Sequence, residues 1–480
     1  MYRPFEVSGW IPYWRQATGT ADTLPHLGAL TEINPFVYTL KQDGTLMDNG
    51  ELEKEPWITL RAAAKAQNVR FIPTIMSGDK ELMHRILSNT QSRIALEDRI
   101  AALVKEKGFD GIDIDFEGKR ADTKDYFSLF LKGLYQRMGD KWVMCTIETR
   151  TPFEDRYYGT QIPADAGIFA NDLVEINKYC DRVRIMAYDQ QGVDQKLAAE
   201  AAAKGEIYAP VGDTRWVEKV VNLMSQSISK NKMMIGVPTY GYGYDVTAYA
   251  NKEYVYDILW TFNPGYAVPI AQQLGIVPAR NAAGELYFTY TDTSVSTTST
   301  SQVLPTSGSH AAAAALAIDA VVTPTNTNAK FRLLTWPDEE SIAQKIALAK
   351  RLGVRGISVF KFDGGQDPDI WRVIETQAQS PAPTPSPTPT PGTPGAFTRT
   401  LTLNSVGEDV RLLQQILNRD VATRIAASGV GSPGQETNRF GALTLAAVKK
   451  FQVKYGIATA GQAGYGLVGP KTRAKLNELR

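Results

Sequence analysis

Residues 1–377 alternate short apolar segments typical of β-strands with longer segments of helical spacing, such as Ser92–Lys107 and Glu339–Arg351. The apolar segments recur roughly every 35–40 residues up to the seventh. The predicted strands are Glu6–Trp10, Pro35–Leu40, Arg70–Ile75, Gly108–Phe116, Trp142–Glu148, Arg182–Tyr188, Met233–Thr239 and Gly356–Phe362. Eight strands in β–α alternation predict an α/β fold, a (β/α)8 TIM barrel.

Two segments interrupt this pattern. A gap of roughly 100 residues after the seventh strand predicts an inserted subdomain between strands 7 and 8, within about 244–330, in which Ala311–Ala320 is a candidate short helix. Residues 378–397 alternate Pro with Thr, which supplies neither ladder hydrogen bonds nor a core, so we expect an extended Pro/Thr linker. Residues 398–480 are predicted to form a separate, small all-α module.

Composition excludes several classes of protein. The 52 Lys and Arg residues balance 51 Asp and Glu, so bulk charge gives no sign of a nucleic-acid partner. Three scattered His and two Cys do not make a zinc site, and we expect no metal and no cofactor. Cys145 and Cys180 are predicted to be buried free thiols. No apolar run approaches the roughly 20 residues of a membrane span, and no signal peptide is visible at the N-terminus.

The strongest local signal is the acidic sequence Asp-Gly-Ile-Asp-Ile-Asp-Phe-Glu, residues 110–117, on the fourth predicted strand. Side chains alternate along a strand, so Asp113, Asp115 and Glu117 share one face while apolar residues occupy the other. Grouped carboxylates split their proton affinities and titrate together. Glu117, at the carboxyl end where barrel enzymes place catalytic residues, could therefore hold a proton near neutral pH and donate it to a leaving oxygen.

Two other interpretations of this strand remain open. A solvated acidic edge would produce the same carboxylates, although the alternating Ile and Phe side chains disfavour it. A site for a hard cation such as Mg²⁺ or Ca²⁺ would also use grouped carboxylate oxygens.

The acidic strand resembles the signature of glycoside hydrolase family 18, DGxDxDxE, which is complete at residues 110–117. The sixth predicted strand has the similar M-x-Y-D at residues 186–189, and the seventh has G-x-P-x-Y-G at 236–241. The resemblance extends over about Val7–Ile374. It looks closest to the spore-cortex and cell-wall glucosaminidase branch, and it is also chitinase-like.

The resemblance implies a role for each acidic or phenolic residue. Glu117 would be the general acid and then the base for water, in a mechanism where the N-acetyl group of the substrate attacks its own anomeric carbon. Asp115 would orient that acetamide, and Asp113 would hold Asp115 from below. Tyr188 would bind the acetamide oxygen, and Asp189 would support the distorted sugar.

Sugar rings have apolar faces, so aromatic side chains near the strand ends are candidates for substrate binding. The candidates are Trp10, Trp14, Tyr240, Trp336 and Phe360. The last of these stands where the family commonly has Trp on the eighth strand. Glu148, after the fifth strand, could touch sugar substituents, although an ordinary ion pair fits it equally well.

Residues 401–479 resemble the small three-helix peptidoglycan-binding domain of the first type. The similar segments are 405–418, 440–452 and 468–472. Six apolar residues at helical spacing are expected in its core: Val410, Leu413, Leu417, Val448, Phe451 and Leu476.

The leading hypothesis is therefore a retaining hydrolase of β-1,4 bonds at N-acetylglucosamine in cell-wall peptidoglycan, extracellular or wall-associated, whose C-terminal module binds the wall. A chitinase, acting on chitin or chito-oligosaccharides, is the first alternative. A non-catalytic sugar-binding lectin on the same barrel is the second, and the intact Glu117 counts against it. The partner expected in each case is a polysaccharide that contains N-acetylglucosamine.

Overall fold

The computed structural model describes residues 5–249, 254–291 and 328–378, followed by 397, 401–402, 405, 407–460, 462 and 464–479. The chain divides into two compact units, Met1–Thr384 and Pro385–Arg480. The predicted helix at Ala311–Ala320 lies outside the described residues. The predicted Pro/Thr linker also lies outside them, apart from its two end residues, Ala378 and Phe397.

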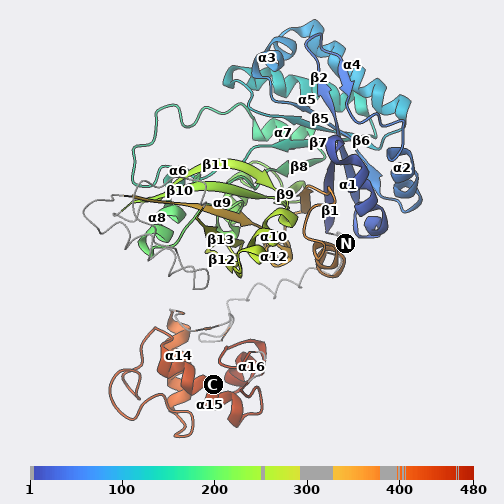
Figure 1. Cartoon of the computed structure of the whole chain (residues 1–480). Helices are drawn as coiled ribbons and strands as arrows, with labels where there is room; N and C mark the ends of the chain where they lie inside the picture. Colours follow the sequence, from blue (N-terminus) through green and yellow to red (C-terminus); the bar gives the residue numbers. More distant parts are fainter. Residues whose placement is uncertain are drawn as a thin grey trace. The chain divides into compact units, whose positions relative to one another are not determined.

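The first unit contains a closed parallel barrel of eight strands, as the sequence predicted (Figure 1). Its strands are β1 (Glu6–Pro12), β2 (Glu32–Leu40), β4 (Arg70–Phe71) with β5 (Thr74–Ser77), β6 (Gly111–Phe116), β7 (Trp142–Ile147), β8 (Arg182–Ile185), β9 (Met233–Pro238) and β15 (Gly356–Phe360). They neighbour one another in the order β1-β15-β9-β8-β7-β6-β5-β2, and pairing of β1 with β2 closes the ring. A short β3 (Leu46–Asp48) pairs antiparallel to β2.

Helices follow the strands around the barrel. They are η1 (Tyr13–Arg15), α1 (Gln16–Thr23), η2 (Leu24–Ala29), α2 (Trp57–Ala66), α3 (Lys80–Ser88), α4 (Thr90–Lys107), η3 (Ala121–Thr123), α5 (Lys124–Met138), α6 (Phe153–Arg156), α7 (Leu173–Tyr179), α8 (Gln195–Ala203), α9 (Thr214–Met224), α12 (Glu339–Leu352), α13 (Ile370–Val373) and η4 (Ile374–Ala378). Within the described parts of the chain, none of the helices is long and apolar enough to cross a membrane.

Local sequence sets where several of these helices begin and end. The carboxylates of Asp79, Asp213 and Asp338 accept hydrogen bonds from first-turn N–H groups of α3, α9 and α12, which satisfies donors that the helix itself leaves open. Gly108 and Gly353 end α4 and α12 in the left-handed conformation, which only glycine adopts without strain.

The strand β6 separates two environments, as its alternating sequence predicted. Ile112, Ile114 and Phe116 are fully buried in the core between barrel and helices, where the Phe116 ring stacks on Phe130 of α5 at 5.7 Å between centroids. Asp115 faces the opposite way and lines a cavity inside the barrel. The hydrophobic effect therefore fixes the register of this strand and, with it, the direction of the carboxylates.

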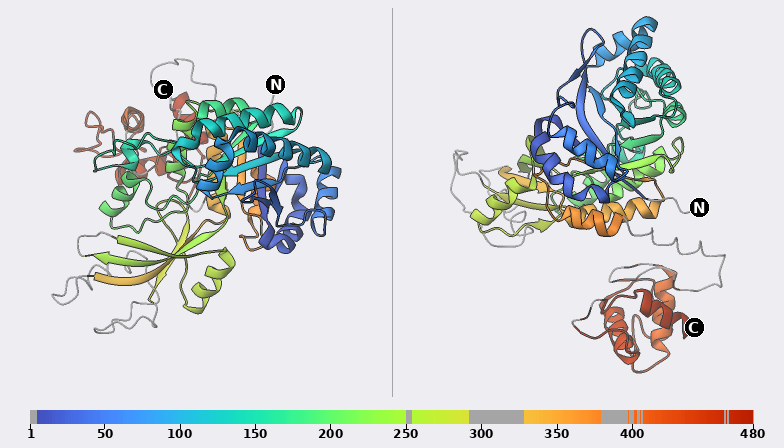
Figure 2. Two further views of the ribbon diagram at one scale, coloured as in Figure 1. Left: turned by 90° about the horizontal axis from the view of Figure 1, so that it is seen from above. Right: turned by 90° about the vertical axis from the view of Figure 1, so that its right-hand side faces the viewer.

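The insertion between the seventh and eighth barrel strands is a second sheet. It comprises β10 (Gly241–Tyr249), β11 (Tyr254–Phe262), α10 (Pro264–Gln273), β12 (Ala279–Arg280), β13 (Leu286–Tyr290) and β14 (Asn328–Trp336). These strands pair antiparallel in the order β11-β10-β14-β13-β12. They project from one side of the barrel (Figure 2, left). The subdomain thus extends a few residues beyond both ends of the predicted range.

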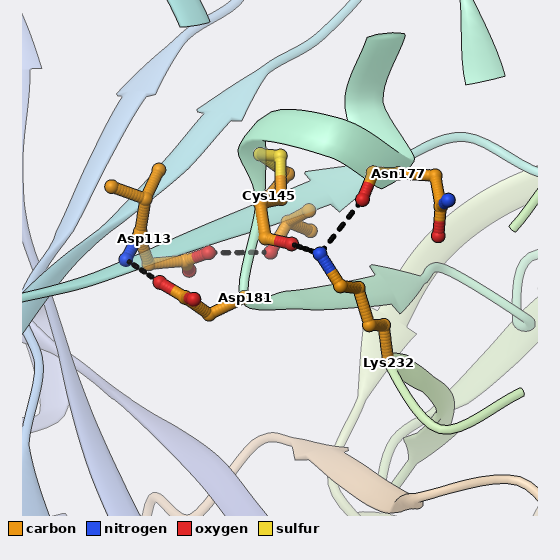
Figure 3. The surroundings of a disulfide bond; sticks show 8 residues. Asp113, Cys145, Asn177, Asp181 and Lys232 are labelled. Atoms are coloured by element: carbon orange, nitrogen blue, oxygen red, sulfur yellow. Dashed lines mark hydrogen bonds between the residues drawn. A yellow bond between two sulfur atoms is a disulfide. The ribbon is translucent and has the colours of Figure 1, made fainter. Parts of the chain in front are cut away.

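Cys145 and Cys180 form a disulfide, so the prediction of free thiols is wrong (Figure 3). Cys145 lies in β7, and Cys180 ends α7 immediately before β8, the strand that pairs with β7. This pairing places the two Cα atoms 5.9 Å apart, within the range that a disulfide spans. Lys232 Nζ donates to the carbonyl oxygen of Cys180 at 2.9 Å and helps to hold that corner.

The second unit contains the three predicted helices, α14 (Glu408–Asn418), α15 (Ala442–Lys454) and α16 (Pro470–Glu478). The six apolar residues expected in its core are all buried, and they pack with Phe397, Leu401 and Phe440. An antiparallel bridge joins Leu401 to Val468. Because this core belongs entirely to the second unit, the module has its own source of hydrophobic stability.

Candidate active site

The acidic face of β6 begins at Asp113, deep inside the barrel. Its carboxylate accepts hydrogen bonds from Trp10 Nε1 at 3.1 Å, Thr74 Oγ1 at 2.8 Å and Thr146 Oγ1 at 2.9 Å. Burial raises the pKa of Asp113 to about 6, and these donors offset part of the rise. Side chains from β1, β5 and β7 thus fix the Asp113 carboxyl in place.

A buried arginine completes the surroundings of Asp113. Arg184 of β8 is fully buried, with Nη1 2.8 Å from Asp113 Oδ2. It also pairs with Glu32 and lies over the Trp10 ring, 5.1 Å from the centroid. Burial lowers the pKa of Arg184 to about 9, so the side chain remains a cation at neutral pH and favours the ionised form of Asp113.

Asp115 and Glu117 form a coupled pair above Asp113. Burial raises the pKa of Asp115 well above its ordinary value, and the charges of Glu117 and Asp113 raise it further. Burial and then the charge of Glu148 raise the pKa of Glu117, which shares a hydrogen bond with Asp115. Two carboxyl groups share a hydrogen bond only when one of them holds a proton. The pair therefore retains a transferable proton to higher pH than an exposed carboxyl would.

Two further charged side chains tune this pair. Glu148 accepts hydrogen bonds from the backbone N–H of Gly118 at 2.7 Å and from Asn171 Nδ2 at 2.8 Å. Lys119 is buried, donates to the carbonyl oxygen of Phe116, and opposes the pKa rise of Asp115 and Glu117 through its charge. Because its two hydrogen bonds hold Glu148 in place, its charge acts on Asp115 and Glu117 from a fixed position.

Replacing Glu148 with Gln tests this coupling. The negative charge of Glu148 raises the pKa of Glu117, so Glu148→Gln lowers that pKa. A reaction that needs protonated Glu117 loses rate as pH rises through its pKa, and the alkaline limb of log kcat/KM against pH should move to lower pH. Glu106→Gln, which removes an exposed carboxylate from α4, is the matched control and should leave the limb in place. An unmoved limb in Glu148→Gln would contradict the coupling.

Tyr188 and Asp189 follow β8 and face the same space. The Tyr188 ring stacks on Phe360, and burial raises the pKa of its phenol well above 10, so the hydroxyl remains a donor. Asp189 has φ of 57°, a left-handed conformation that is unusual outside glycine. Its Oδ1 accepts hydrogen bonds from the hydroxyls of Tyr240 at 2.5 Å and Tyr242 at 2.6 Å. These contacts hold Asp189 at the cavity wall.

The side chains surround two adjoining spaces. The inner hollow, about 120 Å³, is lined by Trp10, Phe36, Asp115, Glu117, Thr146, Met186, Tyr188, Asp189, Tyr240 and Phe360. The outer hollow, about 420 Å³, is lined by Trp14, Arg15, Asp189, Tyr240, Tyr242, Thr261, Phe262, Asn263, Phe360, Lys361 and Asp363. Asp189, Tyr240 and Phe360 line both hollows, which are together called the depression.

Most of the aromatic residues predicted to bind substrate lie around this depression. Trp10, Tyr240 and Phe360 line the inner hollow, and Trp14, with 51% of its surface exposed, lines the outer one. Trp336 does not reach either hollow. It ends β14, is 1% exposed and packs in the core of the insertion, so it has no free face for a sugar and its assignment to the site is wrong.

Sequence reasoning missed several residues of the site. Arg184 and Tyr188 are four positions apart on the sixth predicted strand. Because side chains alternate along a strand, this even spacing could have placed Arg184 on the same face as Tyr188. Tyr242 likewise follows Tyr240 at a spacing of two. Lys119, two residues after Glu117, is a buried cation that no strand pattern marks, and only the folded chain shows where its ammonium lies.

A hard-metal centre was the other interpretation of the acidic strand. Among the residues that the structure describes, no group of three or more His, Cys, Asp or Glu is arranged to hold a metal ion. The Asp113 carboxylate is instead occupied by protein donors.

A model of the glycosyl hydrolases family 18 matches residues 9–365, which include the whole of the acidic strand and both hollows. The chain belongs to glycosyl hydrolase family 18. A family 18 chain is a glycoside hydrolase on a TIM barrel, as the three motifs had indicated. The peptidoglycan-binding resemblance of the C-terminal unit remains a prediction.

Named relatives agree with family 18. The uncharacterized glycosylase YvbX of Bacillus subtilis (strain 168) is 21% identical over 364 residues, 74% of this chain and 88% of that protein. The structure of the spore cortex-lytic enzyme SleL of Bacillus megaterium QM B1551 superposes with a TM-score of 0.55 at 19% identity, covering 78% of this chain and 75% of that one. A chitinase from Chromobacterium violaceum ATCC 12472 gives 0.56 at 15% identity, covering 78% and 99%. At these identities, the structural likeness shows the shared fold.

Proposed function

We propose that this family 18 enzyme hydrolyses β-1,4 bonds at N-acetylglucosamine in bacterial peptidoglycan, with retention of anomeric configuration and with assistance from the substrate. The observation that carries the proposal is the coupled Asp115–Glu117 pair in the inner hollow, which Tyr188 also lines. This arrangement offers one transferable proton, one carboxylate and one neutral donor around a space of about 120 Å³.

In the first step, protonated Glu117 donates its proton to the glycosidic oxygen as the bond from that oxygen to the anomeric carbon breaks. The carbonyl oxygen of the substrate's own acetamide attacks the anomeric carbon and forms a cyclic oxazolinium ion. The Asp115 carboxylate stabilises the positive charge on the acetamide nitrogen, and the Tyr188 hydroxyl donates to the acetamide oxygen and orients it.

In the second step, Glu117 removes a proton from a water molecule, whose oxygen attacks the anomeric carbon and opens the oxazolinium ring. Glu117 is protonated again, and two inversions at the same carbon give net retention. Asp113, fixed by its three donors and by Arg184, supports Asp115 from below. Asp189, held by Tyr240 and Tyr242, supports the sugar from the side.

Peptidoglycan is preferred as the substrate for three reasons. The solved structures with the same fold include the spore cortex-lytic enzyme SleL of Bacillus megaterium. The C-terminal unit has a core of its own and resembles a peptidoglycan-binding module, which would hold the enzyme on the wall. The Cys145–Cys180 disulfide fits an oxidising compartment, where wall polymers are encountered.

A chitinase is the second candidate, because a chitinase is among the solved structures with the same fold and the inner hollow needs only an N-acetylated sugar. Purified peptidoglycan and chitin oligomers, matched in N-acetylglucosamine content, separate the two candidates. We expect the release of reducing ends from peptidoglycan to exceed release from chitin. Cleavage of chitin alone would contradict the proposal and establish the chitinase. Glu106→Gln serves as the active control.

A further inference from the structure

The outer hollow contains two cations and a buried carboxylate in addition to its aromatic walls. Lys361 Nζ pairs with Asp363 Oδ2 and donates to Asn263 Oδ1 at 3.1 Å. The Asp363 side chain, 1% exposed, also accepts hydrogen bonds from Asn263 Nδ2 at 3.0 Å and from the backbone N–H of Gly365 at 2.9 Å. The charges of Lys361 and Asp363 therefore neutralise each other.

Arg15 is the second cation of the outer hollow. It ends η1, which follows β1 at the carboxyl end of the barrel, and its side chain is 41% exposed. Its Nε lies 3.9 Å from Asp363 Oδ2, too far for a hydrogen bond. Within the described part of the chain, the Arg15 side chain donates no hydrogen bond. The guanidinium therefore presents its donors to the outer hollow.

The surroundings of Arg15 are those of a sugar subsite. Trp14 lies beside it on η1 with half of its surface exposed, and its ring is held edge-on against Phe36 at 5.9 Å between centroids. Asp189 is the other carboxylate of the outer hollow. Its Oδ1 accepts hydrogen bonds from two tyrosine hydroxyls, and the residue also lines the inner hollow. A sugar next to the one being cleaved would therefore stack on Trp14 with Arg15 at its edge.

The chemistry of the wall polymer supplies a ligand for this guanidinium. In a strand that alternates N-acetylglucosamine with N-acetylmuramic acid, both neighbours of N-acetylglucosamine carry a 3-O-lactyl group. That group ends in a carboxylate or in a peptide that itself bears carboxylates. Chitin has neither. A guanidinium recognises a carboxylate through paired N–H donors, which makes Arg suited to this discrimination.

We propose that Arg15 binds the carboxylate of the sugar adjacent to the cleaved bond and so selects acidic muramyl polymer over neutral chitin. This selectivity rests on the proposed function. The pair of partly buried Lys361 with buried Asp363 positions the pocket wall, and Arg15, which makes no hydrogen bond to Asp363, provides the donors that bind substrate.

The test compares Arg15→Ala with wild type on glycan oligomers of equal length. The substrates are a neutral chito-oligosaccharide, a peptide-free muramyl oligomer, its methyl ester, and a peptide-bearing muramyl oligomer. We expect Arg15→Ala to lower kcat/KM on a carboxylate-bearing oligomer about tenfold more than on the neutral one. If wild type prefers the peptide-free acid over the neutral oligomer but does not prefer its methyl ester, and Arg15→Ala loses that preference, the ligand is the lactyl carboxylate. If wild type prefers only the peptide-bearing oligomer, the ligand is a carboxylate of the peptide.

Two further variants make the result decisive. Arg15→Lys keeps the charge without the paired donors and should retain part of the selectivity. Arg372→Ala removes an exposed arginine of α13 whose ion-pair partner among the described residues is Asp369, and it should change no ratio. Equal losses on every oligomer would overturn the role of Arg15 while leaving the proposed function intact. Wild-type enzyme that cleaves only the neutral oligomer would overturn both.

Discussion

Glu117→Gln should lower kcat on peptidoglycan by about 10²–10⁴-fold, the range that a positioned general acid contributes. Gln keeps the size and polarity of the side chain but has no proton of suitable acidity to give to the leaving oxygen. The Asp115 carboxyl loses its partner in the shared proton, while Asp113 keeps its three donors. The measurement is the initial rate of reducing-end release under saturating substrate.

Binding separates a chemical defect from an unfolded variant. Glu117→Gln should retain the affinity of wild type for a non-cleavable glycan oligomer, measured by titration calorimetry, because Trp14, Tyr240 and Phe360 still line the depression. Glu106→Gln should keep the full rate, since its carboxylate is exposed on α4. A rate in Glu117→Gln within a factor of about three of wild type would show that another group supplies the proton.

Arg184→Met should lower the free energy of unfolding of the first unit by about 3–5 kcal/mol. Methionine has similar bulk but leaves Asp113 and Glu32, both buried, without the guanidinium that lies between them. Removing one partner from a buried ion pair is costly because Asp113, which is fully buried, then keeps only neutral donors, whereas Glu32 still pairs with Arg70 at 3.2 Å. Urea unfolding followed by tryptophan fluorescence measures this change, because all eight tryptophans lie in the first unit.

The matched control for this measurement is Arg351→Met. Arg351 forms a two-pronged pair with Glu218 on the surface, and such exposed pairs contribute less than about 1 kcal/mol. Equal destabilisation by the two substitutions would contradict the view that the Arg184 pair stabilises the barrel because it is buried.

The fold and the acidic strand were predictable because both depend on short-range periodicity. Alternation of strand and helix gave the barrel, and the period of two along β6 placed Asp113, Asp115 and Glu117 on the inner face. Arg184 obeys the same period. Its partners, Asp113 and Glu32, lie on other strands, and only the closed barrel brings them to it.

The remaining differences depend on contacts distant in sequence. The Cys145–Cys180 disulfide joins residues 35 positions apart, and only the parallel pairing of β7 with β8 brings them together. Trp336 stands close in sequence to the eighth barrel strand, but β14 belongs to the inserted sheet and carries the indole into a different core. The charge balance around Arg15 likewise depends on distant residues, because Lys361 neutralises Asp363 at the far end of the sequence of the barrel.

The reducing end released from digested peptidoglycan tests the central claim most directly. Peptidoglycan treated with the wild-type enzyme is reduced with borohydride, and the reduced sugar is identified by mass spectrometry. Cleavage at N-acetylglucosamine, assisted by the acetamide that Asp115 and Tyr188 hold, predicts reduced N-acetylglucosamine as the new end. Reduced N-acetylmuramic acid as the new end would contradict this account.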